Sequence, residues 1–451
     1  MALNRDLTQG SIPKGLLAFA LPLILGNLLQ QLYNLADTWV VGQFLGEGAL
    51  AAVGSSYTLM TFLTSILLGL CMGSSVFFAM QFGRKDPARF RAGIFQSFCL
   101  IGGLTVVLTG LVYLALGGIL WFLRIPADVW DLTRTYLVWV FAGIPATFLY
   151  NYFANLLRAI GDSVTPLLFL GVSVVGNIGL DLLFVIPLKM GVMGAALATV
   201  LAQYAAGVGL ALWTWQSCPD LRVRPEDRRW DRNILRQLWS LSFFTCLQQS
   251  VMNFGILLVQ GLVNSFGSVV MAAFAVAVKI DTLAYMPVQD FGNAYSTFVA
   301  QNYGAGQRGR IKAGTKWALF WVLVFCLVIG GLVCFFAPQL LAIFVGHDAQ
   351  EVISVGTGYL RIEGSCYLGI GILFLLYGYF RAVDRPAVSL VLTVCSLGTR
   401  VALAYLLSAY PAIGVTGIWA AIPIGWFFAD TVGGILWRKD SKALSSPDCS
   451  R

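Results

Sequence analysis

Residues 16–42 read LLAFALPLILGNLLQQLYNLADTWVVG, an apolar run in which Asp37 is the single charged residue. A helix needs about 20 apolar residues to cross the hydrocarbon core of a bilayer. Similar runs recur along the 451-residue chain, of which 58% is hydrophobic and 11% is charged, against about 25% charged in an ordinary soluble domain. The sequence therefore predicts an all-α integral membrane protein and excludes a soluble enzyme, a disordered chain and a disulfide scaffold.

The hydropathy pattern predicts twelve transmembrane helices. Their approximate limits are 16–42, 50–81, 92–122, 132–156, 164–188, 191–215, 237–263, 269–300, 313–337, 355–380, 386–408 and 414–437. The runs are continuous rather than alternating, which argues against a transmembrane barrel.

The distribution of Lys and Arg predicts the orientation. Of the 29 basic residues, 23 fall in connections on one side, whereas Arg124, Arg134 and Lys189 fall on the other. By the positive-inside rule, both termini should be cytoplasmic in a multi-pass protein of the plasma (inner) membrane. The net charge of +8 then needs no nucleic-acid partner, because the insertion rule and an anionic lipid bilayer account for it.

The chain repeats itself. A shift of 221 residues places Gly46 and Gly93 on Gly267 and Gly314, and a shift of 223 places Tyr136-Leu137 on Tyr359-Leu360. With six spans in each half, both halves enter from the same side, which is typical of parallel repeats. We therefore predict a six-helix lobe over 1–215, a basic cytoplasmic linker over 216–236, a second six-helix lobe over 237–437 and a cytoplasmic tail over 438–451. A basic run of this kind is ordinarily a solvated connector.

Two matched bundles suit alternating access, and so favour a transporter. Acids inside a membrane are costly and usually functional, and the first half contains Asp37 and Asp181. The repeat places Leu258 and Ala404 at the equivalent positions. A requirement of the fold alone should have left acids in both halves. The neighbouring polar residues are also confined to the first half, since Tyr33, Asn177 and Thr199 correspond to Phe254, Arg400 and Ile422.

Asp37, Asp181 and Thr199 are all expected roughly 7–12 Å below the outer surface, at 1.5 Å of helix rise per residue. Tyr33 and Asp37 share one helical face, as do Asn177 and Asp181. Two carboxylates in one dry cavity require a proton on one of them or a cation between them. Their oxygens suit Na⁺ as well as H⁺. The alternative is a pair of structural polar residues that bridge helices.

The second half has polar residues of its own. Lys279 and Asp281, followed by Asp290, form a transport site or, as we favour, a local ion pair. Arg400 either repels a cation from this bundle or pairs with Asp430 or Glu363.

The substrate cleft and a hinge are predicted from further polar residues and one proline. Span 7 carries glutamines and an asparagine that contact substrate or bridge helices; the predicted cleft residues are Asn34, Gln248, Gln249, Asn253 and Arg400. Pro22 lies in span 1, where it frees the carbonyl of Ala18 and produces a static bend or a hinge coupled to Asp37.

Five segments carry a family resemblance: LPLILGNLLQQLYNLADTWVVGQFLG (21–46), GNIGLDLLF (176–184), GVMGAALAT (191–199), YMPVQDFGNAYSTFVAQNYGAG (285–306) and YLRIEG (359–364). Together they resemble the multidrug and toxic compound extrusion (MATE) transporters over residues 10–437. The resemblance implies two six-helix lobes around a V-shaped cleft, and export of amphipathic, often cationic compounds in exchange for H⁺ or Na⁺. It implies a first-lobe cation site at Asp37, Asn177, Asp181 and Thr199, with Tyr33 adjacent, and a bend of span 1 near Pro22. No association motif is evident in the sequence, so we expect a monomer.

Two departures from the family pattern refine this interpretation. Members often have proline after the span 5 aspartate, where this chain has Leu182. Another branch places acids in spans 7 and 10, where this chain offers glutamines and Glu363. The sequence therefore favours first-lobe coupling.

The leading hypothesis is an antiporter without a cofactor other than its coupling ion. The alternative is a flippase for a lipid-linked oligosaccharide or another amphipathic lipid, which needs several cationic side chains to hold a pyrophosphate. The candidates inside the membrane are Lys279, Arg361 and Arg400. A membrane enzyme is disfavoured because no catalytic constellation is evident and the single histidine, His347, falls in an outer loop.

Overall fold

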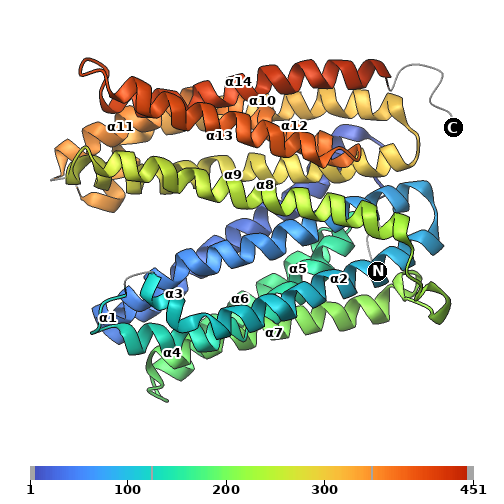
Figure 1. Ribbon diagram of the computed structural model, residues 1–451, viewed down its shortest axis with the longest axis horizontal. Coiled ribbons are helices and arrows are strands. Elements are labelled where there is room, and N and C mark those ends of the chain that lie inside the picture. The colour runs from blue at the N-terminus through green and yellow to red at the C-terminus, as the bar shows by residue number, and fades with distance from the viewer. Residues whose placement is uncertain (1–5, 123–124, 347–348, 444–451) are drawn as a thin grey trace. The chain divides into compact units, whose positions relative to one another are not determined.

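The structure is a computed structural model that describes residues 6–122, 125–346 and 349–443. Arg124, His347 and the end of the predicted tail lie outside these residues. Every regular element within them is helical (Figure 1). The elements are α1 (Ile12–Arg84), α2 (Pro87–Leu114), α3 (Leu116–Phe122), α4 (Trp130–Phe141), α5 (Ile144–Ala159), α6 (Val164–Val185), α7 (Gly191–Ser217), the 3₁₀ turns η1 (Pro219–Leu221) and η2 (Pro225–Asp227), α8 (Arg232–Asn264), α9 (Ser268–Gly304), α10 (Arg308–Val345), α11 (Gln350–Ser365), α12 (Tyr367–Ala382), α13 (Pro386–Ser408) and α14 (Val415–Ala443).

The prediction of twelve spans is confirmed when each bent helix pair counts as one span. Helix α1 contains two spans, Ile12–Gly46 and Gly48–Arg84, because Gly46 interrupts it with a φ of +81°. Two other spans are broken: α4 and α5 meet at 40°, and α11 and α12 meet at 51°. Several helices extend past their predicted limits because charged residues can continue a helix beyond the bilayer.

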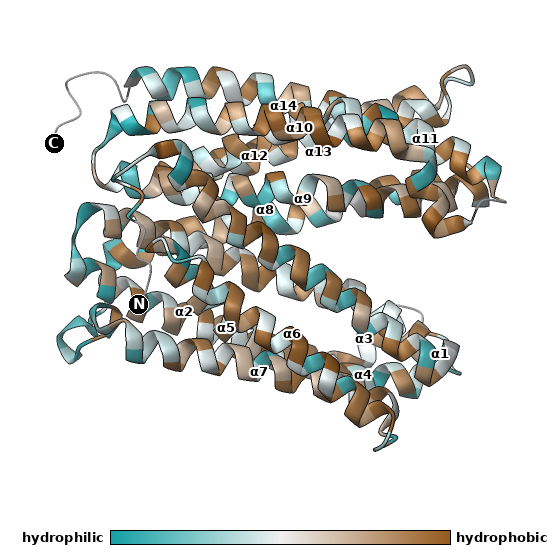
Figure 2. Ribbon diagram, turned by 180° about the vertical axis from the view of Figure 1, so that it is seen from behind, coloured by the Kyte–Doolittle hydropathy of each residue, from teal (hydrophilic) through white to brown (hydrophobic). Residues whose placement is uncertain are grey.

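The surface is apolar along the helices, as expected for contact with lipid. Leu114, Val172 and Ile343 expose 87%, 75% and 76% of their area. Within each unit, hydrophilic residues concentrate toward the ends of the helices (Figure 2). Such an exposed apolar surface marks a site of membrane interaction.

The chain forms two compact units, and each unit contains the start of the first helix of the other half: the first unit includes the start of α8, and the second includes the start of α1. Leu21–Cys246 belongs to the first unit, whereas Leu7–Ala20 belongs to the second, with the residues from Leu247 onward. The start of α8 packs closely in the first unit because Gly73 has no side chain. A Cβ there would lie 2.4 Å from the Leu241 carbonyl oxygen.

In the second unit, Arg310 and Asn302 hold the segment before α1. The Arg310 guanidinium donates to the carbonyl oxygens of Leu7, Gln9 and Gly10 at 3.1, 3.1 and 3.0 Å. The Asn302 amide also donates to the Leu7 carbonyl, at 3.2 Å. The N-terminal segment is thereby fixed to the second unit.

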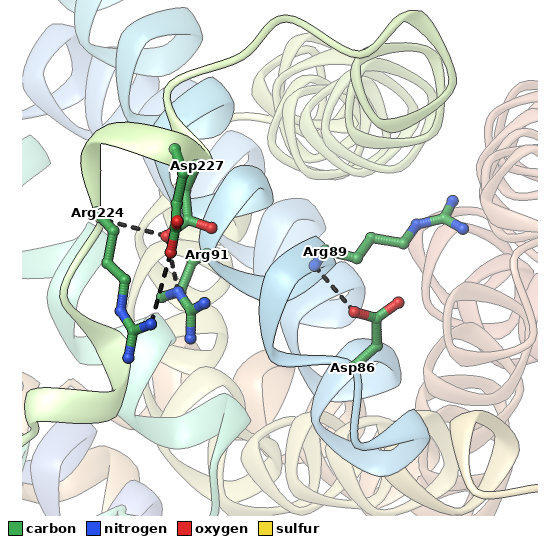
Figure 3. A network of polar contacts seen from close by, with 6 residues as sticks. Asp86, Arg89, Arg91, Arg224 and Asp227 are labelled. Carbon is green, nitrogen blue, oxygen red and sulfur yellow. Dashed lines mark hydrogen bonds and ion pairs between the residues drawn. The ribbon is translucent and has the colours of Figure 1, made fainter.

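The linker is docked on α2 rather than solvated throughout (Figure 3). Arg91 Nε lies 2.7 Å from Asp227 Oδ2, and the backbone N–H of Arg224 donates to the same oxygen at 3.0 Å. Gln96 adds a hydrogen bond to the Arg229 carbonyl at 2.9 Å. Burial alone would raise the pKa of Asp227, but the bonds from Arg91 and Arg224 outweigh it and hold this pKa below its ordinary value. These contacts anchor the basic linker to α2.

Candidate functional site

The predicted first-lobe residues lie on three helices of the first unit. Tyr33 and Asp37 are one turn apart on α1, Asn177 and Asp181 are one turn apart on α6, and Thr199 lies on α7. Asn177 and Asp181 are fully buried, and Tyr33 and Thr199 are nearly so. The tight packing of α6 on α7 brings these polar side chains together.

Asn177 joins two of the helices. With its amide nitrogen facing Asp181, it donates to Oδ2 at 2.9 Å, and its oxygen accepts from the backbone N–H of Thr199 at 3.1 Å. The Thr199 hydroxyl donates to the Ala195 carbonyl at 3.1 Å. Asn177 therefore orients one carboxylate oxygen of Asp181 and leaves the other free.

Asp37 is half-buried and Asp181 is fully buried, and each carboxylate has one oxygen that makes no hydrogen bond to the described residues. Oδ1 of Asp37 and Oδ1 of Asp181 are both buried without a hydrogen-bond partner, and the two groups interact electrostatically. Buried charges are costly unless they are paired. With their unpaired oxygens, these carboxylates have the chemistry to accept a proton or a small monovalent cation.

Apolar residues close the site toward the connections after α6 and after the first span of α1. Val41 lies one turn beyond Asp37, Val185 one turn beyond Asp181, and Ala195 one turn before Thr199. All three belong to one buried cluster. This cluster keeps the carboxylates in the low-dielectric surroundings that make binding of a cation favourable.

Two tyrosines accompany the acids, and the sequence analysis singled out one of them. Tyr33 interacts with Asp37, Asp181 and Thr199. Tyr136 on α4 is buried among the same groups and interacts with Asp37, Tyr33 and Asp181. The sequence feature that could have identified Tyr136 is the repeat, because the 223-residue shift preserves this tyrosine.

Pro22 lies inside α1, where the helix continues without the interruption seen at Gly46. The boundary between the two units passes between Ala20 and Leu21, directly before this proline. The hinge at Pro22 stays a prediction. Pro22 lies close to the point where α1 passes from the second unit to the first.

The second unit has a polar cluster that differs from the predicted one. Lys279 is exposed, and within the described residues it forms no ion pair with Asp281, so that prediction is wrong. Asp281 instead accepts hydrogen bonds from Tyr367 at 2.7 Å and from Tyr359 at 3.4 Å. The reason is helical geometry, because residues two apart point to different sides of a helix.

Arg400 interacts electrostatically with two acids of the second unit. It acts on both Asp281 and Glu363, whereas Asp430 has no such interaction with it. Asp290, the third acid predicted here, is buried on α9. Among the described residues, Arg400 forms no ion pair with either Glu363 or Asp430, so neither predicted pairing is found.

The predicted substrate-cleft residues are distributed over both units. Asn34 is half-buried in the first unit and donates to Gln31 Oε1 at 3.4 Å. In the second unit, Gln248 is buried, with an unpaired Oε1, while Gln249 and Asn253 are half-buried, as is Arg400. Their assembly into one cleft stays a prediction.

The chain is similar to one family model and to proteins that are named for multidrug resistance or for transport. The MatE family model matches residues 22–183 and 243–406. A probable multidrug resistance protein YpnP of Bacillus subtilis is 29% identical, over 96% of each chain. A FAD transporter of Shewanella oneidensis is 25% identical, over 93% of each chain.

Solved structures agree in fold. A crystal structure of MATE in complex with MaL6 superposes with a TM-score of 0.92 at 24% identity, covering 98% of this chain and 99% of the other. An outward-facing multidrug resistance MATE family transporter of the MOP superfamily gives the same values. With the family model matching most of the chain, the protein belongs to the MatE family of membrane transporters and is not an enzyme.

Proposed function

We propose that this chain is a secondary antiporter of the plasma membrane, with both termini cytoplasmic, that exports amphipathic organic compounds in exchange for H⁺ or Na⁺. The observation that carries this proposal is the pair of buried, partly unpaired carboxylates at Asp37 and Asp181. An ion-coupled exporter needs a group inside the membrane that binds the coupling ion. The second half has no acid at the positions that correspond to Asp37 and Asp181.

In the proposed cycle, substrate enters from the cytoplasm while the first-unit site is empty. The two units then rock to expose the substrate outside. A proton on Asp37, or Na⁺ among Asp37, Asn177, Asp181 and Thr199, then weakens substrate binding and favours release. Each step uses the difference in affinity between two conformations, as coupling requires.

Substrate charge is a separate question. Relatives are named for multidrug resistance, and one is named a FAD transporter, so both cationic and anionic amphipaths belong in the test. Ethidium and FAD are suitable probes of the two classes.

The test is uptake by inverted membrane vesicles under a pH gradient or a Na⁺ gradient in turn. We expect one gradient to drive uptake in the wild type and Asp37→Asn to abolish it. Asp131→Asn, which changes an exposed acid on α4, is the matched control and should leave uptake unchanged. Gradient-driven export by folded Asp37→Asn would contradict the proposed coupling. Export under neither gradient would favour a lipid flippase.

A further inference from the structure

The second unit has a basic pocket where α10 begins and α14 ends. The polar and aromatic side chains that line it come from α10, α12 and α14, and they are Arg308, Lys312, Thr315, Tyr379, Trp437 and Ser441. Arg308 and Lys312 are one turn apart on α10, and Trp437 and Ser441 are one turn apart on α14. The described residues that line the pocket include two bases and no acid, and the proposed antiport gives them no role.

Asp440 contacts a residue that lines the pocket, and another base balances its charge. Tyr379 Oη donates to Asp440 Oδ2 at 3.0 Å, and Arg385 Nη1 lies 2.9 Å from Asp440 Oδ1. Both oxygens of this buried carboxylate are therefore engaged. Because Arg385 balances Asp440, the pocket and its surroundings keep an excess of positive charge from Arg308 and Lys312.

The pocket lies where the exposed apolar surface of α10 begins. Lys312 is exposed, and it is followed by Trp317 and Phe320, which expose 41% and 47% of their area. On the other wall, the ring of Trp437 packs edge-to-face on Tyr379 with centroids 6.4 Å apart. Tryptophan and tyrosine are enriched where a membrane meets water. This order of charged, aromatic and apolar residues places the pocket at the level of the lipid headgroups, where an amphipathic anion fits better than a soluble one.

The repeat shows what the corresponding base of the first unit binds. The 221-residue shift places Arg91 of α2 at the position of Lys312. Arg91 Nε lies 2.7 Å from Asp227 Oδ2, and the docked linker leaves the Arg91 side chain 11% exposed. Lys312 is instead exposed and lines the pocket. The two units thus share a base at this position, and in the first unit that base holds an oxyanion.

We propose that this pocket binds the headgroup of an anionic phospholipid, whose phosphate lies between Arg308 and Lys312 and whose acyl chains follow the exposed apolar surface of α10. Side chains four residues apart on a helix are neighbours, so one phosphate can contact both bases. Arginine offers a fork that matches phosphate oxygens, and lysine offers a compact positive charge. Basic pockets between transmembrane helices on the cytoplasmic side bind such headgroups. The binding itself does not depend on the proposed antiport.

Native mass spectrometry of the purified full chain in detergent tests this binding, with phosphatidylglycerol as the probe and phosphatidylcholine as the zwitterionic comparison. The wild type should retain one phosphatidylglycerol at concentrations at which it retains no phosphatidylcholine. Arg308→Gln with Lys312→Gln should weaken phosphatidylglycerol binding about 30-fold, at about 5-fold for each base near an anionic headgroup. Arg438→Gln with Lys439→Gln is the matched control, because it removes the same charge from exposed positions on α14 that do not line the pocket. It should keep most of the wild-type affinity.

Three results would overturn the proposal. Equal weakening in the two double variants would show attraction to the basic surface as a whole. Displacement of the lipid by an equal concentration of inorganic phosphate would show that the acyl chains contribute nothing. Binding that appears only after Asp448→Asn would assign the pocket to the chain's own C-terminal residues. Lys312→Gln alone, at an exposed position, keeps the test decisive if the pocket double variant fails to fold, with a loss of about 5-fold expected and no loss contradicting the proposal.

Discussion

The first-unit site and the second-unit cluster place acids in the two halves of a repeated fold, and they balance charge differently. In the first unit, Asp181 accepts a hydrogen bond from the Asn177 amide, and neither Asp37 nor Asp181 forms an ion pair in the part of the chain that the structure describes. In the second unit, Asp281 and Glu363 lie near the guanidinium of Arg400. The difference teaches that the first pair of acids has no fixed cation to balance it among the described residues, whereas the second pair interacts with the fixed charge of Arg400.

The largest expected effect comes from removing both first-unit acids. Asp37→Asn with Asp181→Asn should reduce gradient-driven export to the level of empty vesicles, because no group then binds the coupling ion there. Uptake by inverted vesicles measures this, with Asp131→Asn as the control. Export driven at half the wild-type rate or more would show that the second unit alone can couple.

Removal of the Arg400 guanidinium should have the second-largest effect. Arg400→Gln leaves two buried acids without a nearby base, which should destabilise the protein by about 1–3 kcal/mol, the usual effect of leaving a buried polar group unsatisfied. Thermal unfolding in detergent measures this, and Arg361→Gln provides the comparison on a neighbouring helix. An equal loss in both variants would mean that Arg400 has no special relation to the acids.

The two tyrosines that hold Asp281 allow a finer test. Tyr367→Phe removes the 2.7 Å bond and Tyr359→Phe removes the 3.4 Å bond. Because a hydrogen bond to a charged group contributes about 1.5–3 kcal/mol and weakens with length, Tyr367→Phe should lower the unfolding temperature more. The reverse order would contradict the assignment of Asp281 as a carboxylate held mainly by Tyr367.

The smallest effect concerns the linker, outside both acid clusters. The pKa of Asp227 is held below its ordinary value, so its ion pair with Arg91 contributes stability above the unfolded pKa of about 3.9. That contribution disappears as pH falls through the folded value. Limited proteolysis should therefore cut the wild-type linker faster only under strongly acidic conditions. Asp227→Asn should be cut faster at neutral pH as well; equal rates there would show that the pair does not anchor the linker.

The fold was largely predictable because lipid imposes a simple requirement. Apolar runs such as residues 16–42 can only be spans, and the repeat fixes their number in each half. The breaks at Gly46 and between α11 and α12 were harder to predict, because local backbone geometry decides them. The assignment of Leu7–Ala20 to the second unit depends on contacts made by Arg310, which lies 300 to 303 residues further along the sequence, and no local pattern reveals them.

The candidate site was predictable for a related reason. Asp37 and Asp181 stand out because acids are rare in membranes, and helical spacing adds Tyr33 and Asn177. Tyr136 was missed as a site residue because tyrosine is ordinary in an apolar helix. The Lys279–Asp281 pair was wrong because nearness in sequence does not place two side chains on one helical face, and the true neighbours of Asp281 come from α11 and α12.

The central claim is that an ion bound by the first-unit acids weakens substrate binding. The most direct measurement is the affinity of the purified protein for ethidium, or for FAD if that is the compound exported, at varied pH and Na⁺ concentration. In the wild type, affinity should fall at low pH or high Na⁺ by a factor of about 5–150, the usual range for coupled sites. With Asp37→Asn and Asp181→Asn together, the affinity should be independent of the ion that acts on the wild type. A full wild-type dependence in that double variant would contradict the account.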